Sequence, residues 1–119
     1  MDRNLTGRCI LIVEDEPLVV LEIAHAFKGA GADVLTAATL REGQSLAEHP
    51  RLSAAIIDFG LGDANSGALC ARLNAREIPF VVYSGYDQVH AECRAGIFIS
   101  KPATPETLIT TVAQLLGRK

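Results

Sequence analysis

Four short apolar runs in the chain each end on residue types that are common in phosphate and metal sites. The runs cover residues 9–13, 54–57, 80–83 and 97–100. The residues at their ends are Glu14 and Asp15, Asp58, Ser84, and Lys101 with Pro102. If the runs are parallel strands, these groups meet at one edge of the sheet. Because ligands of open α/β sheets bind outside the carboxyl ends of the strands, the pattern predicts a ligand site at this edge.

Strand-like and helix-like segments alternate along the whole chain. The strand patterns cover residues 8–13, 33–38, 53–58, 78–84 and 97–100. Helical patterns cover 15–29, 39–49, 66–76 and 88–94, and a last one starts at Thr104. Continuous apolar, β-branched runs are typical of strands that are buried on both faces. The alternation predicts a single α/β domain over residues 1–119 with a doubly wound parallel sheet and no output domain.

Two of the expected helices have an apolar face at helical spacing, which predicts the side that packs on the sheet. In the first helix these positions are Leu18, Leu21, Ile23, Ala24 and Phe27. In the last helix they are Leu108, Ile109, Val112, Leu115 and Leu116.

Composition narrows the classes of function. The net charge of −3, without any basic run, argues against a nucleic-acid partner. No segment reaches the ~20 apolar residues of a membrane span, and no signal peptide is visible. The three cysteines, Cys9, Cys70 and Cys93, have no CxxC spacing and lie in apolar or amphipathic surroundings. They predict reduced, buried thiols in a cytoplasmic protein.

The acids at the strand ends predict a site for a hard divalent cation. Glu14 and Asp15 follow one strand and Asp58 ends another, so their oxygens would form a cluster. Mg²⁺ prefers oxygen ligands and often binds one or two carboxylates together with a substrate phosphate. The alternative is that Glu14 and Asp15 only favour the start of the helix that follows them, where acids are common. The acids by themselves leave both interpretations open.

Ser84 and Lys101 favour the interpretation as a phosphate site. A phosphoryl group on Asp58 has three oxygens that a metal, an ammonium group and a hydroxyl can neutralise. Taken singly, Ser84 is explained as a turn residue and Lys101 as a surface lysine, but their joint position at two strand ends is hard to obtain by chance. The bond between Lys101 and Pro102 is of the kind that can be cis.

In their order and spacing, these residues resemble the receiver domain of two-component response regulators. The resemblance rests on Glu14, Asp15, Asp58, Ser84, Lys101 and Pro102, and it covers essentially the whole chain. It implies a five-stranded parallel sheet of order 2-1-3-4-5 with helices on both faces, as in flavodoxin and CheY. It also implies a phosphoacceptor signalling protein rather than an enzyme that acts on an external substrate.

The resemblance gives each site residue a role. Asp58 would accept a phosphoryl group from a histidine kinase or phosphotransfer protein. The metal, Mg²⁺ or Mn²⁺, would be held by Glu14, Asp15, Asp58 and the backbone carbonyl of Gly60. Ser84 and Lys101 would bind phosphoryl oxygens. Phe98 would be the aromatic residue that changes position when Ser84 is drawn toward the phosphoryl group.

The strand-four segment suggests a subfamily. Residues 78–87 resemble the FATGY-type (FATGUY) motif of some single-domain regulators. The chain departs from the common family pattern in four ways. Ser84 replaces threonine, Ala103 replaces phenylalanine after the Lys-Pro pair, glycines replace a Met-Pro pair after Asp58, and Phe98 has no hydroxyl.

Three functions compete at this stage. The first is a stand-alone receiver that is phosphorylated on Asp58 and signals through protein contacts on its helix 4–strand 5–helix 5 face, with homodimerisation as a further outcome. The second is a receiver fold that serves only as a docking module. The third is a phosphohydrolase of the haloacid dehalogenase type. That class needs a second acid two residues after the nucleophile, and Gly60 occupies this position.

Overall fold

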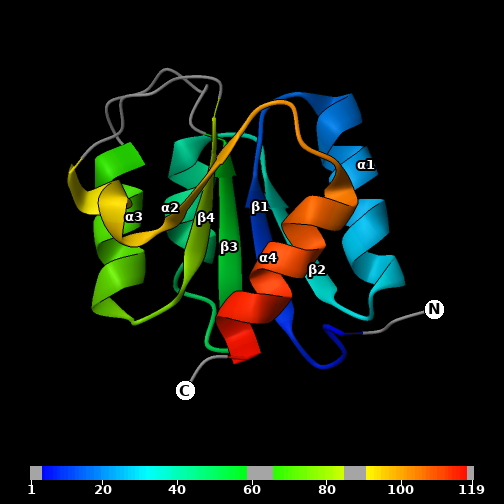
Figure 1. Cartoon of the computed structure of the whole chain (residues 1–119). Coiled ribbons are helices and arrows are strands. Elements are labelled where there is room, and N and C mark those ends of the chain that lie inside the picture. Colours follow the sequence, from blue (N-terminus) through cyan, green and yellow to red (C-terminus); the bar gives the residue numbers. More distant parts are fainter. Residues whose placement is uncertain (1–3, 59–65, 85–90, 118–119) are drawn as a thin grey trace.

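The computed structural model describes residues 4–58, 66–84 and 91–117. Its strands are β1 (Cys9–Val13), β2 (Asp33–Ala37), β3 (Leu52–Asp58), β4 (Phe80–Ser84) and β5 (Ile97–Ser100). Its α-helices are α1 (Pro17–Gly29), α2 (Leu40–Leu46), α3 (Ser66–Ala75) and α4 (Pro105–Gly117), and a 3-10 helix, η2, covers Ala91–Ala95. The strands form one parallel sheet of order β2-β1-β3-β4-β5 (Figure 1). The predicted fold class and strand order are confirmed.

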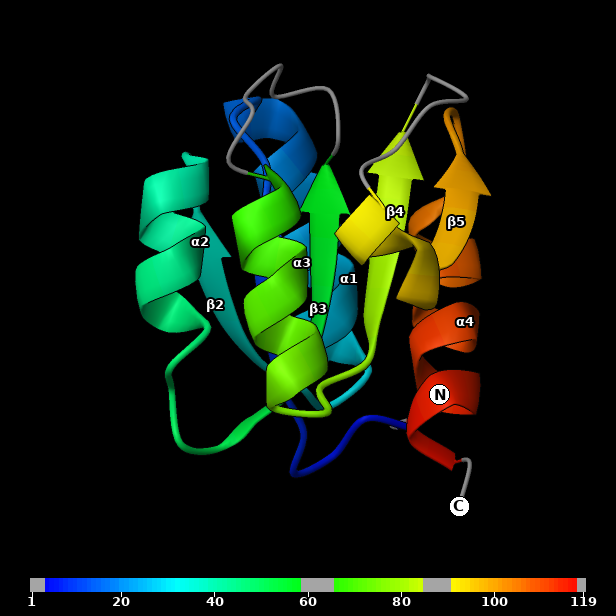
Figure 2. The same ribbon diagram turned by 90° about the vertical axis from the view of Figure 1, so that its left-hand side faces the viewer.

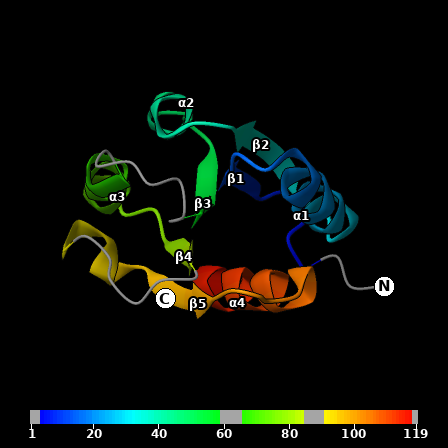
Figure 3. The same ribbon diagram turned by 90° about the horizontal axis from the view of Figure 1, so that it is seen from above.

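Helices cover both faces of the sheet, and each face has its own apolar core. Seen from above, α1 and α4 lie on one side of the strands and α2 and α3 on the other (Figure 3). Figure 2 looks onto the side that carries α2, α3 and η2. Every residue of β1 is buried, as expected for a central strand of a parallel sheet. Side chains of β1 and β3 therefore alternate between the two cores.

The buried face of α1 differs from the predicted one. Ile23, Ala24 and Phe27 are buried as expected, but Leu18 and Leu21 are 79% and 66% exposed. A helix turns by about 100° per residue, so Leu18, nine positions before Phe27, lies on the opposite side of the helix. The predicted apolar face was therefore too wide, and two leucines of α1 remain at the surface. The prediction for α4 holds, with Leu108 and Val112 buried.

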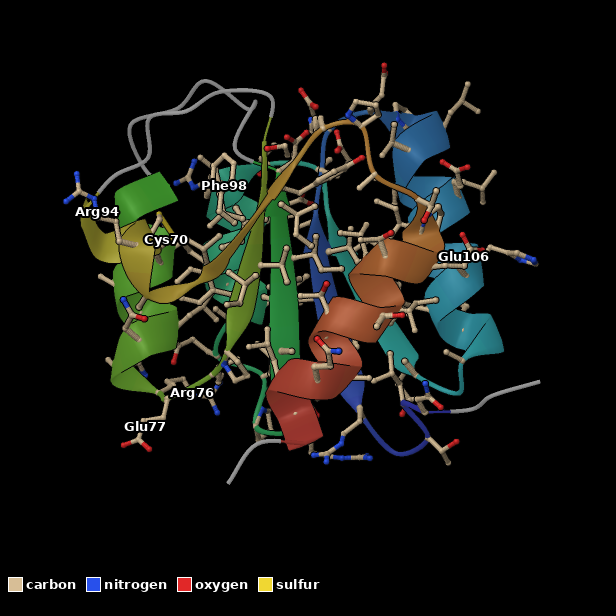
Figure 4. All side chains as sticks on the ribbon, in the orientation of Figure 1. Cys70, Arg76, Glu77, Arg94, Phe98 and Glu106 are labelled. Carbon is tan, nitrogen blue, oxygen red and sulfur yellow. A yellow bond between two sulfur atoms is a disulfide. The ribbon has the colours of Figure 1, made fainter. Side chains whose placement is uncertain are left out.

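Local sequence signals explain where α2 begins. The Thr39 hydroxyl accepts a hydrogen bond from the Glu42 backbone N–H at 3.1 Å, and the Glu42 carboxylate accepts one from the Ala38 N–H at 2.9 Å. These bonds satisfy N–H groups at the helix start. The helix ends at Leu46, earlier than the predicted end near residue 49. The Arg76 guanidinium, labelled in Figure 4, donates to the carbonyls of Ala47 and His49 in this connection.

The described part of the fourth helical segment is of another type than predicted. The sequence pattern predicted a helix over residues 88–94, whereas the structure has the 3-10 helix η2 at Ala91–Ala95. Residues 88–90 lie outside the described part of the chain. The pattern of apolar positions there was weak, and short 3-10 turns commonly act as connectors.

Within the described ranges, no helix has the length and apolar character that a membrane crossing requires.

Two of the three cysteines form a disulfide, so the prediction of reduced thiols was wrong for Cys70 and Cys93. Cys70 in α3 and Cys93 in η2 are both buried and are bonded to each other, with their Cα atoms 5.1 Å apart. That separation is in the normal range for disulfides. The tertiary packing of α3 against η2 brings together residues that are 23 positions apart, which sequence spacing does not reveal. Cys9 is free and buried, as predicted.

Loss of the disulfide between Cys70 and Cys93 is expected to destabilise the domain by about 3 kcal/mol. The bond closes a loop between residues 23 positions apart and so restricts the unfolded chain. Urea unfolding with and without a thiol reductant measures the effect. The double variant Cys70→Ala with Cys93→Ala is the control, and its midpoint should not respond to reductant. Three free thiols in the untreated folded protein, instead of one, would contradict the bond.

Candidate functional site

Parallel pairing brings the predicted site residues to one edge of the sheet. Val13 of β1 pairs with Ile57 of β3, so Glu14 and Asp58 are the next residues of neighbouring strands. Asp58 pairs in turn with Tyr83, and Ser84 of β4 pairs with Ser100 of β5, directly before Lys101. This is the upper edge of the sheet in Figure 1. The predicted meeting of the strand ends is confirmed.

Three carboxylates form a compact cluster at this edge. One carboxylate oxygen from each of Glu14, Asp15 and Asp58 lies within 4.8 Å of the others. Glu14 and Asp58 are buried, with 3% and 4% of their surface exposed, whereas Asp15 is exposed. Two buried acids side by side are unfavourable without a compensating cation. The cluster is therefore arranged to bind positive charge.

Glu14 shows this electrostatic tension most clearly. Burial, followed by a side-chain hydrogen bond with Asp58, raises the pKa of Glu14 to about 7. The Glu16 backbone N–H donates to Glu14 Oε2 at 3.0 Å, and it acts in the opposite direction on the pKa because it stabilises the carboxylate. The backbone N–H of Glu14 donates to the Ala37 carbonyl at 2.9 Å, which fixes the residue at the edge of the sheet.

Lys101 provides the positive charge on the opposite side of Asp58. Its Nζ donates to Asp58 Oδ1 at 2.6 Å. Burial alone lowers the pKa of Lys101, but the hydrogen bond to Asp58 and the charges of Asp58 and Glu14 outweigh it and raise the pKa. The Lys101 side chain is 33% exposed and that of Asp58 is 5% exposed. The ammonium group therefore bridges a buried carboxylate and the open side of the site.

The cluster lies in a cleft that a small ligand can enter. A cavity of about 450 Å³ is lined by Glu14, Asp15, Glu16, Val19, Asp58, Tyr83 and Lys101. A second cavity of about 400 Å³ adjoins it between α1 and β2, and Glu14 and Asp15 line both. The acids and the lysine thus line the same space, beside the first turn of α1.

The residues present fit a magnesium ion. Mg²⁺ takes hard oxygen ligands and keeps several waters, so two or three carboxylates in an open cleft suit it better than a closed cage. Bound there, the ion would neutralise charge on a phosphoryl group and on the acids. Glu14, Asp15 and Asp58 are the residues that would hold it. The proposed carbonyl ligand, Gly60, lies outside the described residues.

The other predicted site residues are placed as follows. Ser84 ends β4 at the expected edge, and its side chain lies outside the described part of the structure. Phe98 lies in β5 and is 40% exposed (Figure 4). The peptide bond between Lys101 and Pro102 is cis.

One residue of the site was not singled out by the sequence. Tyr83 lines the cleft, and its ring lies under the Lys101 ammonium with Nζ 5.2 Å from the ring centroid. The available sequence signal was only its position at the end of a predicted strand, one residue before Ser84. The pairing of Tyr83 with Asp58 across the sheet comes from the structure.

The raised pKa of Glu14 predicts pH-dependent metal binding. A cation binds the carboxylate and competes with the proton, so Mg²⁺ affinity should fall by about tenfold from pH 8 to pH 6. Without metal, the folded state holds this proton more tightly than the unfolded state. Its contribution to stability is therefore full below pH 4.5 and is lost as the pH rises through about 7.

Calorimetric Mg²⁺ titrations at pH 6, 7 and 8, in buffers with different ionisation enthalpies, measure the affinity and the protons released. Glu14→Gln is the control variant, because it should bind Mg²⁺ with little dependence on pH in this range. An affinity of the unaltered protein that stays constant from pH 6 to pH 8 would contradict the prediction.

Comparison with known protein families identifies the class of domain. The response regulator receiver domain family matches residues 10–113. The chain therefore belongs to the response regulator receiver domain family, whose members are signalling modules that bind Mg²⁺ at an acidic pocket.

Sequence identity to individual relatives is low. The chain is 29% identical over 114 residues to the phyllosphere-induced regulator PhyR of Methylorubrum extorquens, covering 90% of this chain and 43% of PhyR. The chain thus spans less than half the length of this relative.

Two solved structures share the fold. A CheY-like receiver domain protein from Methanospirillum hungatei is 24% identical with a TM-score of 0.81, over 93% of this chain and 94% of that chain. The receiver domain of the sensor histidine kinase PA1611 from Pseudomonas aeruginosa is 21% identical with a TM-score of 0.78, over 95% of this chain and all of that chain. The latter structure has a magnesium ion coordinated in its active site cleft.

Proposed function

We propose that this receiver domain accepts a phosphoryl group on Asp58 from a histidine kinase or phosphotransfer protein, with Mg²⁺ bound, and signals through protein–protein contacts. The observation that carries the proposal is the position of Asp58. Its carboxylate lies in one cluster with Glu14 and Asp15 and accepts a hydrogen bond from Lys101 Nζ at 2.6 Å. This arrangement supplies a carboxylate nucleophile, acidic ligands for a metal ion and the positive charge of the Lys101 ammonium group.

In the proposed transfer step, Asp58 acts first, and Lys101 and Ser84 then bind the transferred group. One Asp58 carboxylate oxygen forms a bond to phosphorus while the phosphorus–nitrogen bond of the donor phosphohistidine breaks, and the electron pair stays on the imidazole nitrogen. The Lys101 ammonium then pairs with a phosphoryl oxygen instead of the carboxylate alone, and Ser84 binds another. Water later breaks the acyl phosphate and returns Asp58 and inorganic phosphate. The domain thus assists its own phosphorylation and dephosphorylation.

The surface around the cleft suits a protein donor. Leu18 and Leu21 of α1 are exposed, and Leu21 lines the cavity that adjoins the acidic site. Apolar groups beside a reactive carboxylate favour contact with an apolar protein surface. We assign this part of α1 to contact with the phosphohistidine-bearing protein.

The output surface is proposed on the other side of the site. The helix 4–strand 5–helix 5 face of the sequence prediction corresponds to η2, β5 and α4 in this structure. Phe98, 40% exposed in β5, is the proposed switch aromatic on this face. Phosphorylation would shift an existing equilibrium between two positions of this side chain and so change binding of a target or of a second copy. The stand-alone role, the FATGUY subfamily and the cytoplasmic location stay predictions.

Phosphotransfer profiling tests the proposal. The purified domain with Mg²⁺ is mixed with a panel of autophosphorylated histidine kinases, and transfer is followed by radiolabel. Rapid transfer from one kinase, lost when the metal is chelated, is expected. No transfer from any kinase and no labelling by acetyl phosphate would favour the docking module instead. Turnover of a small phosphoester would favour the phosphohydrolase.

A further inference from the structure

Tyr83 lies beside the proposed acceptor Asp58, but the transfer step described above gives Tyr83 no role. It is buried, with 8% of its surface exposed, and it is the strand partner of Asp58 in β4. Its side chain lies on the α1 and α4 side of the sheet, in the same apolar cluster as Ile56 and Val81. Its packing is accounted for by that cluster. Its polar contacts lead elsewhere, toward the segment that carries Lys101.

The hydroxyl of Tyr83 holds the backbone that follows the catalytic lysine. It accepts a hydrogen bond from the Ala103 N–H at 3.1 Å and donates one to the Ala103 carbonyl at 3.3 Å. A phenol can do both at once because its oxygen accepts while its proton is donated. Both polar backbone groups of one residue are thus bound by one side chain. The residue they belong to lies two positions after Lys101.

The ring of Tyr83 contacts the lysine head group itself. Lys101 Nζ lies over the ring at 5.2 Å from its centroid, which is within the range of a cation–π interaction. The same nitrogen donates to Asp58 Oδ1 at 2.6 Å. The ammonium is therefore held between a carboxylate and an aromatic face. A lysine side chain otherwise has four flexible carbons and no preferred direction.

We propose that Tyr83 is a positioning residue that fixes the Lys101 ammonium for phosphoryl transfer, by clamping the Ala103 backbone with its hydroxyl and supporting the ammonium with its ring. This inference rests on the proposed function of Asp58 as acceptor. Small errors in the position of a charged group can cost up to about 100-fold in rate, so a fixed lysine matters.

Two substitutions separate the contributions of the hydroxyl and the ring. Tyr83→Phe keeps the ring and removes both hydrogen bonds, whereas Tyr83→Leu also removes the ring. Phosphoramidate is the donor, because a small donor makes the rate independent of kinase docking. The phosphorylation rate constant is expected to fall about fivefold to tenfold in Tyr83→Phe and further in Tyr83→Leu. The affinity for Mg²⁺ should stay within about twofold, since the proposed ligands are the three acids.

A double-mutant cycle distinguishes positioning from general support of the fold. In the Lys101→Ala background, Tyr83→Phe should have no further effect on the rate, because the group that it positions is gone. Equal effects of Tyr83→Phe in both backgrounds would overturn the proposal. An unchanged phosphorylation rate in both Tyr83→Phe and Tyr83→Leu would also overturn it.

A measurement without phosphorylation separates this inference from the proposed function. If the unaltered protein is not labelled by any donor, the proposed function fails. The Lys101 side-chain carbon shift in ¹³C-labelled protein then decides the matter, since the ring current of Tyr83 should affect it. A clear change of this shift in Tyr83→Leu supports the positioning contact, and an unchanged shift overturns it.

Discussion

Replacement of Asp58 by asparagine is expected to reduce phosphorylation by acetyl phosphate, phosphoramidate or any kinase to background. The carboxylate oxygen is the nucleophile, and a neutral amide does not replace it. Asp58 is also the carboxylate to which Lys101 donates at 2.6 Å, so the variant loses both the phosphoryl acceptor and the charged partner of the lysine. Intact-mass spectrometry after incubation with Mg²⁺ and donor measures the bound phosphoryl group.

The same variant should alter Glu14. Its pKa should fall in Asp58→Asn because the neighbouring carboxylate is removed, yet stay above the ordinary value of 4.5 because burial is the larger cause. Side-chain ¹³C shifts recorded against pH follow this titration. The fold of the variant is checked by circular dichroism.

Asp33→Asn is the matched control for Asp58→Asn. Asp33 is an exposed acid at the start of β2, at the opposite edge of the sheet, so its loss should not change labelling. Labelling of Asp58→Asn at the unaltered rate would show that the phosphoryl group is carried by another residue, which peptide mapping would then locate.

Removal of the exposed acid of the cluster has the second largest expected effect. Asp15→Ala should weaken Mg²⁺ binding by about tenfold to 100-fold. It removes one of three clustered carboxylates from a site that depends on charged oxygen ligands. Since Asp15 is exposed, little loss of folding stability is expected, and the free energy of unfolding measured in urea without metal should change little.

Calorimetry or fluorescence titration at pH 8 compares Asp15→Ala with Asp33→Ala, which removes an exposed acid far from the cleft. Phosphorylation of Asp15→Ala should recover in part at high Mg²⁺ concentration, because the acceptor Asp58 is intact. An unaltered Mg²⁺ titration of Asp15→Ala would exclude Asp15 as a ligand.

Much of the fold follows from patterns that are local in the sequence. The strands were predicted to within about two residues, because runs such as residues 9–13 are apolar at every position and so must be buried on both faces. The starts of α2 and α1 are marked by the Thr39 cap and by Pro17, which act within one turn. The errors fell where the local signal was ambiguous. Leu18 and Leu21 fit an apolar stripe, but only packing decides how wide the buried face is.

In the site, too, some features follow from local sequence and others only from packing. Parallel strands place their carboxyl ends at one edge, so the strand-end residues Glu14, Asp58 and Lys101 were predicted to meet without knowledge of any distance. The role of Tyr83 was not predicted. Its hydrogen bonds with Ala103 and its contact with Lys101 join residues about 20 positions apart. No sequence spacing encodes such a contact.

The sequence by itself determined the alternation of strands and helices, and the residue types that end four of the strands, because both are properties of short stretches of chain. Only the tertiary structure decided which charges become buried together, so the raised pKa of Glu14 and the pairing of Asp58 with Lys101 depend on it. It also decided that Cys70 and Cys93 are bonded rather than free. Burial, charge coupling and covalent pairing all depend on distances between side chains that are remote in sequence, and those distances exist only in the folded domain.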